Sequence, residues 1–280
     1  VSMKIDAHQH CWNYTENASD FTWMSDDLSI LRQNFMPADL EPLLAQKGFE
    51  GSIVVQAREV MEETDFLLKL AKKHRKIKGV VGWIDLCADD AEASVDLYHG
   101  NSYLKGFRML IHDRSDVDFA DSPRHLKGVS ILNKYGYTYD LLLRTVHLPA
   151  AIRLVQKLQN QPFVVDHIAK PAMNGCDWEA WKSGIEDISK FPNVMCKLSG
   201  LVTEADWKNW HASDFIPYLD VVLEAFGADR LMIGSDWPVC TVATDYHSTM
   251  NIVERWAEKL TTEEQLLIMG GTCAKFYSIS

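Results

Sequence analysis

Short apolar runs alternate with amphipathic segments along the whole chain. The apolar runs cover residues 3–10, 51–57, 77–86, 104–111, 138–144, 162–168, 193–198 and 230–236. Parallel strands that are covered by crossover helices produce this arrangement of short apolar runs and amphipathic stretches. The pattern therefore predicts eight parallel strands.

The segments between the apolar runs have the features of helices. Helices are predicted at residues 37–47, 62–74, 149–159 and 218–226. The second of them places Phe66, Leu67 and Leu70 on one face, which is the period expected of a helix lying on a core. The fourth stops at Gly227, a residue type that commonly ends helices.

Length and composition alone leave the number of domains open. A chain of 280 residues, 47% of them hydrophobic, can form one barrel or two small domains. Eight strand-and-helix units without an internal repeat or linker favour one α/β domain, residues 3–280, folded as a closed (β/α)₈ TIM barrel. An open doubly wound sheet is less favoured, because no Gly-x-Gly-x-x-Gly follows the first strand. Val1 and Ser2, before Met3, are expected to be foreign to the domain.

One long segment, residues 13–36, has no clear hydrophobic period. It directly follows the first predicted strand. Loops that follow the strands of such a barrel gather at its catalytic mouth, so this segment is expected to form a lid there.

The strongest chemical pattern lies at the ends of the first and last strands. His8 and His10 are two residues apart, so on a strand both imidazoles project from the same face. Barrel closure makes the first and last strands neighbours, which brings Asp236 to the same place. Either histidine alone could be a packed core residue, but the pair with a carboxylate opposite favours a catalytic site.

Polar residues end most of the other strands as well. They are Gln56, Arg58, Asp85, Arg108, His112, Asp140, Arg144, Asp166, His167, Lys170, Lys197 and Ser199. Adjacent strand residues face opposite sides, so His167 is expected to face the mouth and Asp166 to be a structural hydrogen-bond acceptor. Asp85 and Asp140 either orient a neighbour or cap a helix. Three cationic residues either neutralise barrel-end carboxylates or bind substrate: Arg58, Arg108 and Lys170.

Net charge and apolar content indicate which partners the chain can bind, and its cysteines indicate the compartment. The net charge is -11 and the pI is near 5.3, which opposes nonspecific binding to nucleic acid or anionic membranes. No stretch reaches the roughly 20 apolar residues of a membrane span. The six cysteines are scattered without a Cys-x-x-Cys pair, which is typical of a cytoplasmic protein with reduced thiols.

The chain resembles the amidohydrolase superfamily, and within it the amidohydrolase-2 type sugar-acid lactonases. The resemblance covers nearly the whole chain, and the longest matching runs are Ile5-Asp6-Ala7-His8-Gln9-His10, Val55-Gln56-Ala57-Arg58, Gly79-Val80-Val81-Gly82-Trp83-Ile84-Asp85-Leu86, Thr138-Tyr139-Asp140-Leu141-Leu142, Val165-Asp166-His167-Ile168-Ala169-Lys170-Pro171, Cys196-Lys197-Leu198-Ser199-Gly200-Leu201-Val202-Thr203-Glu204-Ala205-Asp206-Trp207 and Gly234-Ser235-Asp236-Trp237-Pro238-Val239-Cys240. The resemblance implies a barrel hydrolase with His8, His10, His167 and Asp236 at its centre.

The reaction that the resemblance implies is opening of a small sugar-acid lactone, of the L-fucono- or L-rhamnono-lactone kind, by water. In this hypothesis Asp236 is the general base, and the three histidines polarise the lactone carbonyl. The side chains expected to bind substrate are Gln56, Arg58, Arg108, Lys170 and Trp237. His8, His10, His167 and Asp236 could instead hold one divalent ion, zinc or manganese, so the sequence leaves metal-free and single-metal catalysis open.

Two positions depart from the family pattern. Met109 stands where a histidine is expected after Arg108, and Thr272 stands where an asparagine is usual. They put the identity of the substrate in doubt. Many superfamily members bind two metals that are bridged by a lysine from the fourth strand and a histidine from the fifth; neither strand supplies that ligand here, so a binuclear site is not expected.

Rival functions remain at this stage. One is another superfamily hydrolase or decarboxylase that acts on an aromatic acid or amide, and another is a ligand-binding barrel without catalysis. A homo-oligomer is compatible with the sequence, since barrels often associate through their outer helices, but no surface for it is identified.

Overall fold

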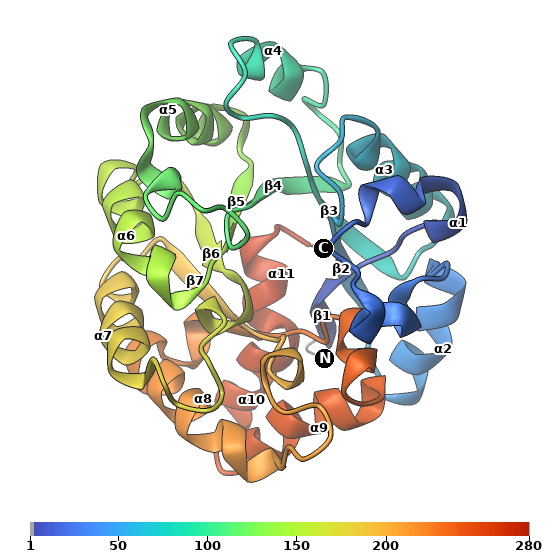
Figure 1. Ribbon diagram of the computed structural model, residues 1–280, viewed down its shortest axis with the longest axis vertical. Coiled ribbons are helices and arrows are strands. Elements are labelled where there is room, and N and C mark those ends of the chain that lie inside the picture. The colour runs from blue at the N-terminus through green and yellow to red at the C-terminus, as the bar shows by residue number, and fades with distance from the viewer. Residues whose placement is uncertain (1–2, 280) are drawn as a thin grey trace.

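The structure is a computed structural model that describes residues 3–279, so the expectation for Val1 and Ser2 lies outside the described residues. Its strands are β1 (Ile5–Gln9), β2 (Gly51–Val55), β3 (Ile77–Gly82), β4 (Leu104–Leu110), β5 (Thr138–Leu142), β6 (Phe163–Val165), β7 (Val194–Leu198) and β8 (Leu231–Ile233). All eight predicted strands are present, and the single-domain TIM barrel is confirmed (Figure 1).

The strands form one parallel sheet in the order β1 to β8. The backbone N–H of Asp236 donates to the carbonyl of His8 over 2.8 Å, and that of His10 donates to the carbonyl of Trp237 over 2.7 Å. These bonds join the segment after β8 to β1. They close the barrel and bring the His-x-His motif beside the carboxylate.

Helices surround the strands, as the alternating pattern predicts. They are α1 (Tyr14–Asn17), α2 (Pro37–Gln46), α3 (Glu62–Lys73), α4 (Ala91–Asp96), α5 (Pro123–Leu132), α6 (Leu148–Lys157), α7 (Trp178–Ser189), α8 (Ala212–Phe226), α9 (Tyr246–Ala257), α10 (Thr262–Leu266) and α11 (Thr272–Phe276). The predicted start of α8 is wrong, because the helix begins at Ala212 and continues through Pro217. Burial of Phe215 and Leu219 outweighs the missing N–H of the proline.

Two apolar layers hold the barrel. The larger one packs the outer faces of the strands against the helices. The smaller one fills the barrel interior, where Ile5, Val55 and Val81 meet Cys273 and Tyr277 from the C-terminal segment. Figure 1 shows α11 near the centre of the ring of strands. This layer closes the barrel at the end opposite the catalytic mouth.

The segment at residues 13–36 contains α1 and two 3₁₀ helices, Ala18–Asp20 and Asp26–Leu31. It has a small core of its own, made by Trp12, Phe21, Met24 and Leu31. The indole N–H of Trp12 donates to the Gln33 carbonyl over 2.9 Å. The segment is therefore packed irregular structure, which explains its lack of a hydrophobic period.

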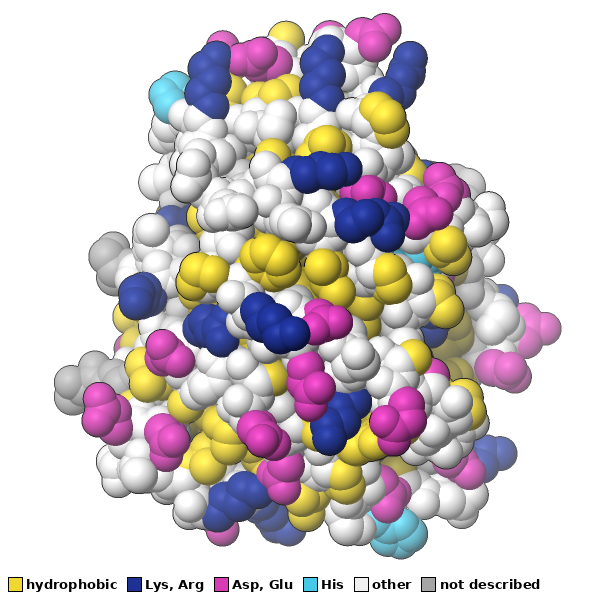
Figure 2. Space-filling model, turned by 90° about the vertical axis from the view of Figure 1, so that its left-hand side faces the viewer, with side chains coloured by type: hydrophobic (Ala, Val, Ile, Leu, Met, Phe, Trp, Pro, Cys, Tyr) yellow, Lys and Arg dark blue, Asp and Glu magenta, His cyan; other side chains and the backbone are white. Residues whose placement is uncertain are grey.

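Charged side chains of both signs cover the molecular surface that Figure 2 shows. On the face in Figure 2, acidic and basic side chains are interspersed, with hydrophobic side chains gathered across the middle. Of the helices that the structure describes, none is long and apolar enough to cross a bilayer. All six cysteines are free thiols.

Candidate active site

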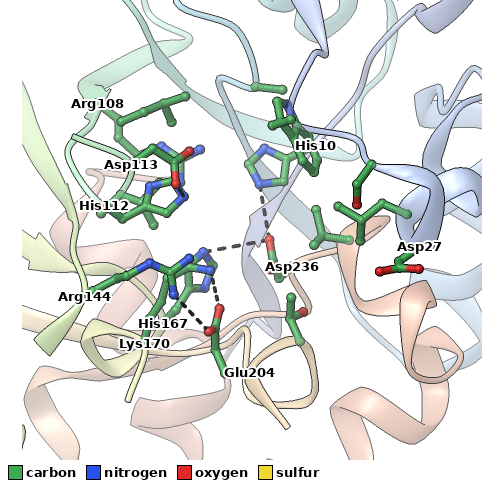
Figure 3. A pocket seen from close by; sticks show the side chains of 18 of the residues that line it. His10, Asp27, Arg108, His112, Asp113, Arg144, His167, Lys170, Glu204 and Asp236 are labelled. Atoms are coloured by element: carbon green, nitrogen blue, oxygen red, sulfur yellow. Dashed lines mark hydrogen bonds and ion pairs between the residues drawn. The ribbon is translucent and has the colours of Figure 1, made fainter. Parts of the chain in front are cut away.

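A cavity of about 380 Å³ opens at the carboxyl ends of the strands (Figure 3). Its polar wall consists of His10, Asp27, Arg108, His112, Asp113, Arg144, His167, Lys170, Glu204 and Asp236, together with Ser25 and Thr203. Trp23 and Leu28 also line it. The predicted lid is confirmed, since these two residues and Asp27 belong to the segment at 13–36.

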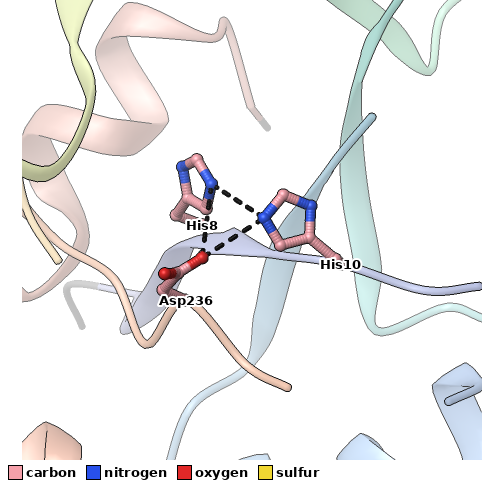
Figure 4. Close-up of side chains that lie close together, drawn as sticks. All are labelled: His8, His10 and Asp236. Atoms are coloured by element: carbon pink, nitrogen blue, oxygen red, sulfur yellow. Dashed lines mark hydrogen bonds and ion pairs between the residues drawn. The ribbon is translucent and has the colours of Figure 1, made fainter. Parts of the chain in front are cut away.

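The histidines and the carboxylate converge at the base of this cavity. Nε2 of His8 lies 3.2 Å from Nε2 of His10, and Nε2 of His10 lies 3.2 Å from Oδ1 of Asp236 (Figure 4). Nε2 of His167 and Nε2 of His8 each lie 3.8 Å from the same oxygen. His10, His167 and Asp236 line the cavity, whereas His8 is fully buried directly behind them.

The backbone turns sharply where two of these residues leave their strands. His167 to Lys170 all have positive φ, and so does Asp236, at 55°. This left-handed conformation costs non-glycine residues roughly 1–2 kcal/mol each, and such strain is concentrated at functional sites. The turns also explain why β6 and β8 end earlier than the apolar runs suggested.

His167 is oriented by the neighbouring strand. Its Nδ1 makes a 2.8 Å hydrogen bond with the hydroxyl of Ser199. Gly200 has a φ of 67°, and a Cβ there would come within 2.7 Å of the His167 ring. The Ser-Gly pair after β7 thus gives the ring both a partner and the space that it occupies.

The electrostatics of the cluster favour an ionised carboxylate beside neutral rings. Burial acts to raise the pKa of Asp236, but the adjacent His167 and His10 outweigh it and hold the pKa below its ordinary 3.8. Burial lowers the pKa of His8 and of His167 well below 6.5. Near neutral pH, Asp236 can therefore accept a proton, and His8 and His167 carry no charge.

A network of buried charges lies next to His8. The ammonium of Lys197 lies 2.5 Å from Asp140, 3.0 Å from Asp166 and 3.1 Å from Nδ1 of His8. Arg108 donates to the other oxygen of Asp166 over 2.9 Å. Asp166 and Asp140 thus hold cations inside the barrel, in agreement with the structural role expected for Asp166.

Of the five residues expected to bind substrate, some line the cavity and others lie behind its wall. Arg108 and Lys170 line the cavity, but Gln56, Arg58 and Trp237 are not among its lining residues. Gln56 is buried and accepts two hydrogen bonds from Arg108, at its side-chain and backbone oxygens. Trp237 packs behind the wall, with its ring centroid 5.3 Å from that of Phe35.

Arg58 joins the lid to the barrel. It donates to Glu63 of α3 over 2.7 Å and to Asp20 of the lid over 2.9 Å. Both carboxylates face the guanidinium, which is 7% exposed. Arg58 therefore holds the lid against the barrel through Asp20 and Glu63, and does not line the cavity.

The strand-end rule found His112 and Arg144, which come shortly after β4 and β5 and line the cavity. Two other cavity residues, Asp113 and Glu204, were not singled out from the sequence. Glu204 lies on a 3₁₀ turn in the loop after β7, and its place in the cavity wall has no simple periodic pattern.

Both departures from the family pattern lie away from the cavity. Met109 packs in the core between the strands and the helices. Thr272 starts α11, and its hydroxyl donates to the Ala228 carbonyl over 3.3 Å. Neither side chain contacts the cavity, so these substitutions affect packing.

The cluster offers donors of the right type and spacing for one divalent ion. His8, His10 and Asp236 each present a donor atom, and all three atoms lie within 4.8 Å of one another. In a tetrahedral zinc site, neighbouring donor atoms lie about 3.3 Å apart. The separations of 3.2, 3.2 and 3.8 Å fit this geometry.

Comparison with known proteins agrees with this geometry. Residues 5–279 match the family described as amidohydrolase. The chain belongs to the amidohydrolase family. It is 39% identical to the L-fucono-1,5-lactonase of Burkholderia multivorans, with 99% of this chain and 97% of that protein covered. It is 34% identical to the L-fucono-1,5-lactonase of Burkholderia ambifaria, over 100% of this chain and 97% of that protein.

A solved amidohydrolase structure has the same fold. The crystal structure of an amidohydrolase from Burkholderia multivorans with bound zinc superposes with a TM-score of 0.94 at 39% identity, covering 99% of this chain and 100% of that one. Amidohydrolases of this kind therefore can hold a metal, and the cluster in this amidohydrolase has donors that suit one.

Proposed function

We propose that this amidohydrolase is a lactonase that hydrolyses a sugar-acid lactone of the L-fuconolactone type. One observation carries the proposal: an ionised carboxylate, Asp236, lies at the base of a polar cavity with imidazoles on either side. Lactone opening needs a base for water and donors for the carbonyl oxygen. The two Burkholderia lactonases support the choice of substrate class.

The reaction begins with a water molecule beside Asp236. The carboxylate removes a proton as the water oxygen attacks the lactone carbonyl, which forms a tetrahedral intermediate. When the intermediate collapses, the ring C–O bond breaks, and Asp236 returns its proton to the leaving alkoxide. The products are one hydroxy acid and the regenerated carboxylate.

The negative charge that develops on the carbonyl oxygen needs donors close by. In the proposed mechanism, the Ser199 hydroxyl is the donor to Nδ1, so that His167 carries its ring proton on Nε2 and can donate it to this oxygen. Arg108, with Nη1 3.3 Å from Nε2 of His8, adds a fixed positive charge. His8 and His10 hold Asp236 in place from the other side.

The remaining polar wall binds the sugar hydroxyls. Lys170 donates to Glu204 over 2.5 Å, and Arg144 donates to the same carboxylate over 3.3 Å. This group presents donors and acceptors opposite the lid residue Asp27 (Figure 3). Three residues act behind the wall: Gln56 by holding Arg108, Arg58 by holding the lid, and Trp237 by packing.

A divalent ion, zinc or manganese, would be held by His8, His10, His167 and Asp236. When bound, such an ion supplies a Lewis acid and acidifies its bound water. We expect chelated protein to bind one Zn²⁺ per chain in a calorimetric titration. His10→Ala should weaken binding about 100-fold, because even groups that only orient a ligand alter affinity by about 10- to 100-fold. His112→Ala, on the cavity wall, is the matched control and should bind as wild type does.

The pH dependence follows from the direction of the pKa shifts. Asp236 loses its basic form only as pH falls through a pKa below 3.8, and His8 and His167 gain protons only well below 6.5. We therefore expect kcat/KM, corrected for spontaneous hydrolysis, to be flat from about pH 5 to 7.5. An inflection near 6.5 would show that a protonated histidine controls the rate.

The direct test is a pH-indicator assay on a panel of sugar lactones. L-Fucono-1,5-lactone and L-rhamnono-lactone should be opened rapidly, with one proton released per molecule. Dihydroxybenzoates serve as controls for decarboxylation and should release no carbon dioxide. A flat response to every lactone would reject the proposal.

A further inference from the structure

The cavity at the barrel mouth is lined by charges of both signs. Among the described residues that line it, the acidic ones are Asp27, Asp113, Glu204 and Asp236, and the basic ones are Arg108, Arg144 and Lys170. A partly buried cation that lacks an anionic partner binds carboxylates strongly. The pairing of these charges therefore decides whether the cavity prefers a charged or an uncharged ligand.

Two of the cations share a single carboxylate on one side of the cavity. The ammonium of Lys170 lies 2.5 Å from Oε1 of Glu204, and Nη1 of Arg144 lies 3.3 Å from Oε2. The side chains of Lys170 and Glu204 are only 10% and 14% exposed, so water and salt screen this pair less than they would a surface pair. Glu204 thus supplies the carboxylate that these two cations would otherwise take from a ligand (Figure 3).

The third cation, Arg108, is neutralised from behind the cavity wall. Its Nη1 donates to Asp166 over 2.9 Å, and its Nε and Nη2 donate to the two oxygens of Gln56 over 2.8 and 2.7 Å. Asp166 and Gln56 are fully buried, so these bonds do not depend on what the cavity contains. Glu204 is therefore the wall carboxylate that decides how much positive charge a ligand meets.

Two further carboxylates, Asp27 and Asp113, are exposed where the cavity meets solvent. Asp113 lies 3.1 Å from Nε2 of His112. Burial, aided by Lys170 and Arg108, lowers the pKa of His112 to about 2, so this imidazole is neutral and leaves the charge of Asp113 in place. The outer part of the cavity is therefore acidic.

The proposed reaction changes the charge of the ligand. An uncharged lactone becomes a hydroxy acid that is ionised near neutral pH, and one proton is released. The new carboxylate forms beside Asp236, in the cavity that Lys170 and Arg144 also line. Free cations at this place would hold the product and slow its release, which limits the turnover of many enzymes.

We propose that Glu204 is a specificity-determining residue, which neutralises Lys170 and Arg144 so that the cavity selects uncharged sugar lactones and releases the anionic sugar acid. This role rests on the proposed function. Specificity of this kind comes from disfavouring the wrong ligand as well as from binding the right one. Lys170 and Arg144 keep hydrogens for sugar hydroxyls, but their charge is already balanced.

A calorimetric titration of the full chain, freed of metal by chelation, tests this role with two probes. One is L-fuconate, the anionic product, and the other is L-fucitol, which has the same hydroxyls but no carboxylate. L-Fuconate should bind wild type no more tightly than L-fucitol does. In Glu204→Gln, the Kd of L-fuconate should fall at least about tenfold, which corresponds to about 1.4 kcal/mol. The gain should shrink as salt is added, and the Kd of L-fucitol should not fall.

Two variants serve as matched controls. Glu204→Asp keeps the negative charge on a shorter side chain, so its Kd for L-fuconate should stay within about threefold of the wild-type value. Asp113→Asn removes a carboxylate from the same cavity, but one that pairs with the neutral imidazole of His112. It should also change this Kd by less than about threefold.

An unchanged Kd of L-fuconate in Glu204→Gln would overturn the proposal, and so would equal tightening of both probes, since a change of charge affects only the anion. If Glu204→Gln does not fold, wild type decides, because binding of L-fuconate more than about tenfold tighter than L-fucitol would also overturn it. Neither titration needs turnover. A failed lactone assay together with the tenfold gain would reject the lactonase but leave the charge selection by Glu204 standing.

Discussion

Asp236→Asn is expected to lower kcat for lactone opening by at least about 1,000-fold, which lies within the range that a positioned general base supplies. Asparagine has nearly the same shape as aspartate, but its amide cannot take a proton from water. The substitution also removes the negative charge that lies 3.2 Å from His10. The fold should remain, because the backbone bond that closes the barrel uses the N–H of residue 236 and is unaffected.

Steady-state kinetics with a thermal melt of each protein check this prediction. Asp27→Asn is the matched control, since Asp27 lines the same cavity on the lid but lies outside the histidine cluster. It should change kcat less than about tenfold, the effect of losing a binding contact rather than a base. Near-wild-type turnover in Asp236→Asn would remove the base from the mechanism.

Much of this site could be predicted because strands impose simple rules. Side chains two apart share a face, and a closed barrel makes its first and last strands neighbours. These rules place His8, His10 and Asp236 together, and the distances confirm that they meet. His167 also meets this cluster, but not through strand alternation: β6 ends at Val165, and Asp166 and His167 both place an atom within 4.8 Å of His8.

The direction of long side chains could not be predicted by the same rules. Arg58 and Arg108 both follow or occupy strands near the mouth, yet only Arg108 lines the cavity. The difference depends on partners far away in the sequence. Asp20 and Glu63 draw Arg58 toward the lid, whereas Gln56 and Asp166 hold Arg108 beside the histidines.

The partners in the buried charge network around Lys197 also could not be predicted from the sequence. Lys197 stands in an apolar strand, where a lysine is costly unless it is paired. Its partners, Asp140 and Asp166, come from two other strands, and only the register of the closed sheet shows that they share one layer. The sequence indicates that such residues need partners, but the three-dimensional arrangement identifies them.

Arg108→Met is expected to lower the free energy of unfolding by about 3–5 kcal/mol, the usual cost of removing one partner from a buried ion pair. Arg108 is 3% exposed. Without it, Lys197 is the remaining cation that pairs with Asp166. The side-chain and backbone oxygens of Gln56 also lose the donor that Arg108 provides. Burial acts to raise the pKa of Asp166, and the lowering that Lys197, His8 and Arg108 provide would be weakened. At about 2–4 °C per kcal/mol for a chain of this size, the melting temperature should fall by about 10 °C.

Arg144→Met is the matched control for this variant. Arg144 also lines the cavity and pairs with Glu204 at 3.3 Å, but its side chain is 45% exposed. Exposed pairs contribute about 0–1 kcal/mol, so its melting temperature should fall by less than about 4 °C. Calorimetric or fluorescence melts of the three proteins, recorded at the same pH and salt, compare them directly. Equal shifts in the two variants would mean that Arg108 acts only as one more wall cation, and that Lys197 by itself is enough to hold Asp166 in the barrel.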